Sequence, residues 1–141
     1  MKRARVLAIP LALAILLGAG AVARARMQRD DAPTVPKDAR APDGARIKVE
    51  VLNGTRTRGL ARRATMLLRD RGFDVLETGT SARTQDTTLV LDVSGHPDWA
   101  NRVAKMFGAA RVEARPDSSS YLDVTVVIGA TWRPPAEPFY P

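Results

Sequence analysis

The sequence predicts an α+β fold: a two-layer βαββαβ(β) sandwich with one mixed or antiparallel sheet and two helices on one face, preceded by a single N-terminal membrane helix. Three observations predict it. Residues 6–23 carry no charge and have basic flanks, residues 46–133 alternate between strand-like and helix-like apolar periods, and the stretch between them has neither period. The chain therefore divides into a membrane anchor or signal segment (1–23), a disordered linker (24–45), a folded domain (46–133) and a proline-rich tail (134–141).

The apolar run of residues 6–23 predicts contact with a membrane. As a helix it would rise about 27 Å, close to the roughly 30 Å hydrocarbon core of a bilayer. Residues 1–29 hold six of the 22 Lys and Arg residues and no acidic residue, so most of the net charge of +7 flanks this run. It is either a retained signal anchor or a signal peptide cleaved after Ala23, and Arg24 and Arg26 just downstream favour the anchor.

Both alternatives export the rest of the chain. The expected location is the cell membrane, as a single-pass protein with a cytoplasmic N-terminus and an extracytoplasmic C-terminal domain, or a secreted protein if the segment is cleaved. Residues 24–45 contain three prolines and almost no large apolar residue, which predicts a solvated tether. The tail holds four prolines in eight residues and predicts extended chain.

The first elements of the domain follow from alternation and spacing. Ile47, Val49 and Val51 alternate with polar residues and predict a half-buried strand over 46–53. Thr57 is the expected N-cap of the next helix, and Gly72 its expected end. The apolar stripe of this helix is Leu60, Ala64, Leu67 and Leu68.

The remaining elements complete the order. A strand over 73–78 is expected to point Phe73 and Val75 inward, and a short strand is expected at 111–114. A strand over 87–93 is expected to bury Leu89, Leu91 and Val93. A second helix from Pro97 to Gly108 has the stripe Ala100, Val103, Ala104 and Phe107. The closing strand, 121–129, points Val124, Val126 and Ile128 inward.

Four stretches occur together at a specific spacing: IKVEVLNGT (47–55), GLARRATMLLRDRGFDV (59–75), TTLVLDV (87–93) and DVTVVIG (123–129). In this combination the chain resembles the LytR C-terminal domain family over essentially all of 46–133. The resemblance implies a wall-related role outside the membrane, since the family often follows the LytR–CpsA–Psr phosphotransferase domain, which attaches anionic polymers to the cell wall. That catalytic domain has no counterpart between the anchor and the domain, so no catalytic residue carries over. The family usually has a proline where this chain has Arg58.

The residues give no basis for catalysis or cofactor binding. The chain has no cysteine and one histidine, His96, which excludes thiol chemistry and a His/Cys metal site. A Ser-His-Asp arrangement would need a serine near His96, and none lies in a G-x-S-x-G elbow. Gly54 and Gly59 have the spacing of a P-loop without its Lys and hydroxyl residues. We predict no enzyme, no catalytic residue, no metal and no cofactor.

The feature that most suggests a binding site is a cluster of basic residues. Residues 56–71 carry six arginines against Asp70 alone, and Arg58, Arg62 and Arg69 share one sector of the predicted helix, opposite its apolar stripe. Because guanidinium groups suit phosphate, this surface is a candidate site for an anionic wall polymer or lipid headgroups. The alternative is an ordinary solvated face, since 18 of the 22 basic residues are arginine. The candidate polymer-binding residues are Arg56, Arg58, Arg62 and Arg69.

A second candidate surface is the open face of the sheet. If side chains there cluster, they form an apolar patch suited to a protein or glycan contact. The residues expected to point away from the helices are Leu52, Leu76, Val90 and Val127. Trp132, just past the last strand, is a further candidate for stacking on sugars.

These observations predict a non-catalytic, membrane-anchored cell-envelope protein whose extracytoplasmic module interacts with the cell wall or its anionic polymers. The expected partners are the membrane, through residues 6–23, and an anionic wall polymer or envelope protein; the oligomeric state is left open. One alternative is a nucleic-acid-binding or regulatory domain of ferredoxin-like topology. Export and the lack of stacking aromatics on the central strands argue against nucleic acid. Another is an accessory to a cell-wall polymer phosphotransferase.

Overall fold

The computed structural model describes residues 35–136. The predicted anchor, 6–23, and the end of the predicted tail lie outside the described residues. Within 35–136, neither helix combines the length and the apolar composition that crossing a bilayer requires.

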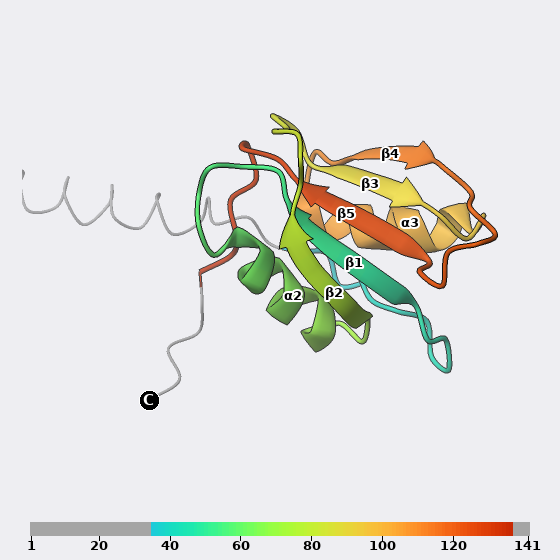
Figure 1. The fold of residues 1–141 in the computed structure, drawn as a ribbon. Helices are drawn as coiled ribbons and strands as arrows, with labels where there is room; N and C mark the ends of the chain where they lie inside the picture. The colour runs from blue at the N-terminus through green and yellow to red at the C-terminus, as the bar shows by residue number, and fades with distance from the viewer. Residues whose placement is uncertain (1–34, 137–141) are drawn as a thin grey trace, which may run out of the picture. The chain divides into compact units, whose positions relative to one another are not determined.

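The elements follow one another in the predicted order (Figure 1). They are β1 (Lys48–Asn53), α2 (Leu60–Asp70), β2 (Asp74–Thr80), β3 (Leu89–Asp92), α3 (Pro97–Ala104), the 3₁₀ turn η1 (Lys105–Phe107), β4 (Arg111–Ala114) and β5 (Val124–Ile128). The described strands form one five-stranded sheet in the order β2-β1-β5-β3-β4. β1 pairs in parallel with β2 and β5, β3 pairs in parallel with β4, and β3 and β5 are antiparallel. The α+β class and the mixed sheet are confirmed.

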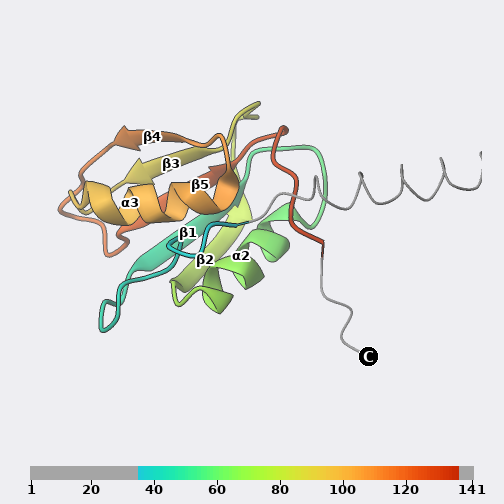
Figure 2. The same ribbon diagram turned by 180° about the vertical axis from the view of Figure 1, so that it is seen from behind.

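Both helices cover the same face of the sheet (Figure 2), so the opposite face, which is turned toward the viewer in Figure 1, is open. α2 packs over β1 and β2, and α3 packs over β3 and β4. Each helix therefore connects two neighbouring parallel strands, and the last strand, β5, joins the two β-α-β halves at the centre of the sheet. This arrangement leaves β2 as one edge of the sheet, with α2 beside it.

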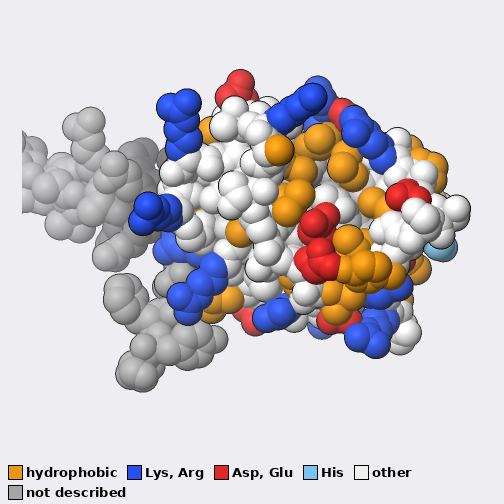
Figure 3. Space-filling model, in the orientation of Figure 1, with side chains coloured by type: hydrophobic (Ala, Val, Ile, Leu, Met, Phe, Trp, Pro, Cys, Tyr) orange, Lys and Arg blue, Asp and Glu red, His pale blue; other side chains and the backbone are white. Residues whose placement is uncertain are grey.

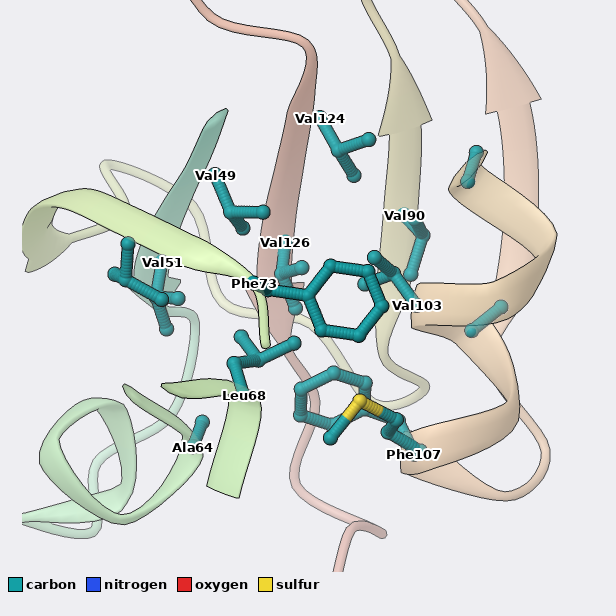
Figure 4. Close-up of a cluster of buried hydrophobic side chains, with 14 of the residues drawn as sticks. Val49, Val51, Ala64, Leu68, Phe73, Val90, Val103, Phe107, Val124 and Val126 are labelled. Carbon is teal, nitrogen blue, oxygen red and sulfur yellow. The ribbon is translucent and has the colours of Figure 1, made fainter. Parts of the chain in front are cut away.

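The core lies between the sheet and the helices (Figure 4). Val49 and Val51 of β1 and Val124 and Val126 of β5 are fully buried, in one cluster with Leu68 of α2. Burial of each such side chain contributes about 1.5–3 kcal/mol before conformational entropy is counted. The inward-facing residues predicted for β1, β5 and both helices are all buried or packed against this cluster.

The register predicted for β3 is wrong. Val90, expected on the open face, is fully buried in the core, and Asp92 is buried on the same side. The Oδ1 atom of Asp92 accepts hydrogen bonds from the backbone N–H groups of Gly95, at 2.9 Å, and His96, at 3.0 Å. A buried polar group is tolerated when it is satisfied in this way. Leu89 and Leu91 consequently lie on the open face.

The predicted N-cap is also wrong. α2 begins at Leu60 after Gly59, which has φ 83°, and this end of the helix has no side-chain cap. Thr57 instead belongs to the preceding loop, where its carbonyl accepts a hydrogen bond from Asn53 Nδ2 at 2.8 Å. The Thr57 N–H also donates to Thr55 Oγ1 at 3.0 Å, so the backbone of Thr57 is held in the loop and not at the start of the helix. The predicted end of the helix at Gly72, with φ 84°, is confirmed.

Residues 35–45, predicted to be part of a disordered linker, pack against the domain. Ala39 is 0% exposed and Ala41 8% exposed, and both belong to the core cluster. The Ala41 N–H donates to the Arg71 carbonyl at 2.9 Å, and Lys105 Nζ lies 2.5 Å from Asp38 Oδ2. That hydrogen bond from Lys105 lowers the pKa of the Asp38 carboxyl. Two alanines between prolines have no strand-like or helix-like period. The sequence therefore did not predict that residues 35–45 pack on the domain.

Candidate functional site

A groove of about 730 Å³ lies between α2 and the C-terminal half of β2, and we call it the arginine groove. Its residues come from the end of β1, the loop before α2, one face of α2 and the edge strand β2. They are Asn53, Arg58, Gly59, Ala61, Arg62, Thr65, Met66, Arg69, Thr78, Gly79 and Thr80. None of them is acidic.

The structure brings together three of the four candidate arginines. Arg58, Arg62 and Arg69 line the arginine groove, whereas Arg56 is exposed on the loop outside it. Arg62 and Arg69 are seven residues apart, about two helical turns or roughly 10.5 Å along the axis. Basic side chains lie over the end of the molecule that holds α2 and its preceding loop (Figure 3).

The arginines of the groove differ in their partners. Arg69 Nη2 donates to the carbonyl of Val75 at 2.9 Å and so connects α2 to β2. The side chains of Arg58 and Arg62 make no hydrogen bond or ion pair with any residue between 35 and 136. The first turn of α2 also has no acidic residue. Two guanidinium groups therefore face solvent without a neutralising partner.

The opposite wall of the groove consists of threonines. Thr78 pairs with Val51 and Thr80 with Asn53, so both side chains lie on the sheet face that α2 covers. Both are exposed, because β2 is an edge strand and α2 does not cover this end of it.

A β-bulge decides which residues of β2 reach this wall. Val49 pairs with Val75, but the next residue, Glu50, pairs with Glu77, so Leu76 is an extra residue in β2. Without the bulge, the alternation of side chains would place Glu77 on the helix side. The bulge instead places Glu77 on the open face, and it keeps a carboxylate out of the arginine groove.

The floor of the groove is made of small side chains. Ala61 and Thr65 are the residues that α2 presents there, and the Thr65 hydroxyl donates to the Ala61 carbonyl at 2.8 Å. Met66, which is 49% exposed, lies at the rim. The floor thus offers apolar surface and a hydroxyl whose donor is already used.

The loop before α2 is organised by Asn53. Its Oδ1 accepts hydrogen bonds from the N–H and the hydroxyl of Thr55, at 3.0 and 2.8 Å. A Cβ on Gly54 would lie 2.7 Å from the Ile128 carbonyl, so this position requires glycine. The Gly54 N–H donates to the Ile128 carbonyl at 3.0 Å, so the Asn53-Gly54 pair holds the loop that carries Arg58 close to the end of β5.

The groove residues on β1 and β2 were not predicted from the sequence. Asn53, Thr78 and Thr80 were not among the candidate site residues. No signal in the sequence reveals them, because their orientation depends on the bulge at Leu76 and on the edge position of β2.

The second candidate surface is only partly formed. Leu52 pairs with Val127 across β1 and β5 on the open face, and Leu76 is 42% exposed at the bulge. Val90 is in the core, so its assignment to this face was wrong. Val127 is only 7% exposed, because Leu52 and Leu89 flank it in register. Figure 3 shows apolar side chains on this face interrupted by acidic ones.

The histidine lies apart from the groove. His96 is the N-cap residue of α3, its ring stacks on Trp99 with centroids 4.0 Å apart, and its Nδ1 lies 3.1 Å from Ser94 Oγ. Asp92 binds backbone N–H groups rather than the imidazole, so these three residues do not form the relay of a hydrolase. The described residues contain no cluster of three possible metal ligands.

Trp132, a candidate for stacking on sugars, is not available for that contact. It is 6% exposed and packs on Phe107, with ring centroids 5.2 Å apart.

The fold and the groove define a class: a small two-layer α+β domain with a groove lined by arginines on its surface. The chain belongs to the LytR C-terminal domain family, because the family model described as LytR cell envelope-related transcriptional attenuator matches residues 46–132, more than half of the 141 residues. This is an accessory-domain family, usually non-catalytic, and the chain therefore carries a cell-envelope-associated domain.

Two solved structures are similar to the chain. The soluble domain of a conserved hypothetical secreted protein from Mycobacterium marinum is 18% identical with a TM-score of 0.50, over 77% of this chain and 76% of that one. The C-terminal domain of RV0431 is 31% identical with a TM-score of 0.37, over 70% of this chain and 83% of that one. No curated protein matches the chain. The first of these supports the fold alone.

Proposed function

We propose that this protein is a non-catalytic envelope protein, held at the membrane by residues 6–23, whose extracytoplasmic domain binds an anionic cell-wall polymer in the arginine groove. The observation that carries the proposal is the convergence of Arg58, Arg62 and Arg69 on one groove that has no acidic lining residue. Membership of a cell-envelope-related family supports the compartment.

The chemistry of the groove supports a polyanion. Guanidinium groups form paired hydrogen bonds to phosphate and carboxylate oxygens. Each exposed ion pair contributes only about 0.2–1 kcal/mol, so affinity requires several contacts along one chain. Such contacts weaken as salt screens the charges.

The nucleic-acid alternative has less support. Modules of this topology that read RNA stack bases on aromatic side chains of the sheet. The central strands β1 and β5 carry no aromatic residue, and their open-face residues include Glu50, Leu52, Thr125 and Val127. A role as accessory to a separate wall-polymer phosphotransferase is compatible with binding the same polymer.

Co-sedimentation tests the proposal. Full-length protein in detergent is expected to sediment with purified anionic wall material, and added salt is expected to release it. Changing Arg58, Arg62 and Arg69 together to Gln should weaken binding roughly tenfold or more.

The matched control changes Arg40, Arg83 and Arg115, three exposed arginines outside the groove, to Gln. It removes the same charge and should bind nearly as the wild type does. Equal loss in both triple variants would show that net charge, and not the groove, causes sedimentation. Unchanged binding in the groove variant would eliminate the site.

A further inference from the structure

We propose that the polymer bound in the arginine groove is a hydroxyl-bearing phosphodiester, a polyol phosphate or glycosyl phosphate chain. Its phosphates contact α2 and the loop before it, and its hydroxyls contact β2. This inference rests on the proposed function and names the substrate class of the same site. It comes from the different chemistry of the two walls.

The wall formed by α2 and the loop before it supplies positive charge. Arg58 and Arg62 have no partner among residues 35–136, while the hydrogen bond from Arg69 to the Val75 carbonyl joins this wall to the strand. Two unpartnered guanidinium groups, with a third two helical turns away, fit charges that repeat along a chain better than a single phosphate ion.

The strand wall supplies neutral hydrogen-bonding groups. Thr78 and Thr80 lie two residues apart on one face of β2, which places them about 6.6 Å apart along the strand. Their hydroxyls have no partner in the part of the chain that the structure describes. A hydroxyl both donates and accepts, so this wall complements alcohol groups, which also do both.

The β-bulge in β2 keeps the strand wall of the groove neutral. Because Leu76 is the extra residue, the threonines face the groove and the Glu77 carboxylate does not. A carboxylate there would repel a phosphate chain. The floor of Ala61, with Met66 at the rim, offers apolar surface to the carbon backbone of a polyol or sugar.

Binding of two probe polymers tests the inference. Full-length protein in detergent is titrated with poly(glycerol phosphate) and with inorganic polyphosphate of the same mean charge, which has no alcohol groups along its chain. We expect the wild type to bind poly(glycerol phosphate) about tenfold more tightly. Anionic phospholipid in mixed micelles with the same detergent and single-stranded RNA serve as competitors, and neither should displace the polymer at equal charge.

The variant Thr78→Val with Thr80→Val keeps shape and strand propensity but removes both hydroxyls. It should lose the preference between the two polymers and keep its affinity for polyphosphate. The matched control, Thr84→Val with Thr87→Val, changes two exposed threonines outside the groove and should keep the preference.

The outcomes separate the two proposals. Equal wild-type binding of both polymers, or an unchanged preference in the Thr78/Thr80 variant, overturns the inference and leaves polyanion binding intact. Binding of neither polymer overturns the inference, and the proposed function is overturned as well if the protein also fails to sediment with anionic wall material. Displacement by the phospholipid micelles or by RNA assigns the groove to a different ligand and overturns the inference.

Discussion

At the scale of single residues, position rather than charge distinguishes the arginines. Arg58 and Arg62 line a groove without acidic residues, whereas the exposed Arg111 and Arg115 both lie close to Glu113. The sector shared by Arg62 and Arg69 could be predicted because helical periodicity alone defines it, whereas Arg58 reaches the same groove from the loop before α2. The threonines opposite could not be predicted, because their direction depends on a bulge.

Asp92 gives a residue-scale prediction about stability. Its buried carboxylate satisfies the N–H groups of Gly95 and His96 at the entrance to α3. Asp92→Ala removes that acceptor and should lower the free energy of unfolding by about 2 kcal/mol or more. Asp92→Asn keeps an oxygen at the same place and should lose less. Urea unfolding of the unit Pro33–Pro141 measures both, and an unchanged midpoint for Asp92→Ala would contradict this role.

The same residue explains an error of prediction. Alternation assigns Leu89 and Leu91 to the core, and it therefore assigns Val90 and Asp92 to the open face. The structure reverses this because local N–H groups compensate the buried carboxylate of Asp92, while Val90 fills the core. Alternation of polar and apolar residues cannot show that a buried carboxylate has local hydrogen-bond donors.

At the scale of elements, strands and helices were predictable because each has its own apolar period. Element ends and irregular segments were less predictable. Because Asn53 and Thr55 hold the loop that follows β1, α2 begins only at Leu60. Residues 35–45 pack on the domain through Ala39 and Ala41. Neither feature has a periodic signal.

Residues 35–45 give an element-scale prediction. A unit that begins at Arg46 lacks the core contacts of Ala39 and Ala41 and the hydrogen bond from Arg71 to the Pro36 carbonyl. Compared with the unit Pro33–Pro141, it should unfold with a free energy lower by about 2 kcal/mol. In the longer unit, Ala39→Asp should reproduce the loss by burying a charge, and Arg40→Gln, at an exposed neighbour, should not. Equal stability of both units would contradict a structural role for this segment.

At the scale of the whole molecule, the order of elements was predictable and their arrangement in the sheet was not. The last strand, β5, lies at the centre and joins two β-α-β halves, which leaves β2 at an edge beside α2. That edge forms one wall of the arginine groove. Outside residues 1–29, which hold the predicted anchor, acidic and basic residues nearly balance, at 15 against 16. The proposed attraction for a polyanion is therefore local to the groove.

The most direct test of the central claim, that the groove contacts a wall polymer outside the membrane, is photo-crosslinking in living cells. A photo-crosslinking amino acid replaces Met66 at the rim of the groove in the full-length protein, and a second variant carries it at Tyr121, which is 55% exposed and outside the groove. Irradiation is expected to attach anionic wall polymer at position 66 and little or none at position 121. Adducts with cytosolic protein or nucleic acid, or equal polymer yields from both positions, would contradict the account.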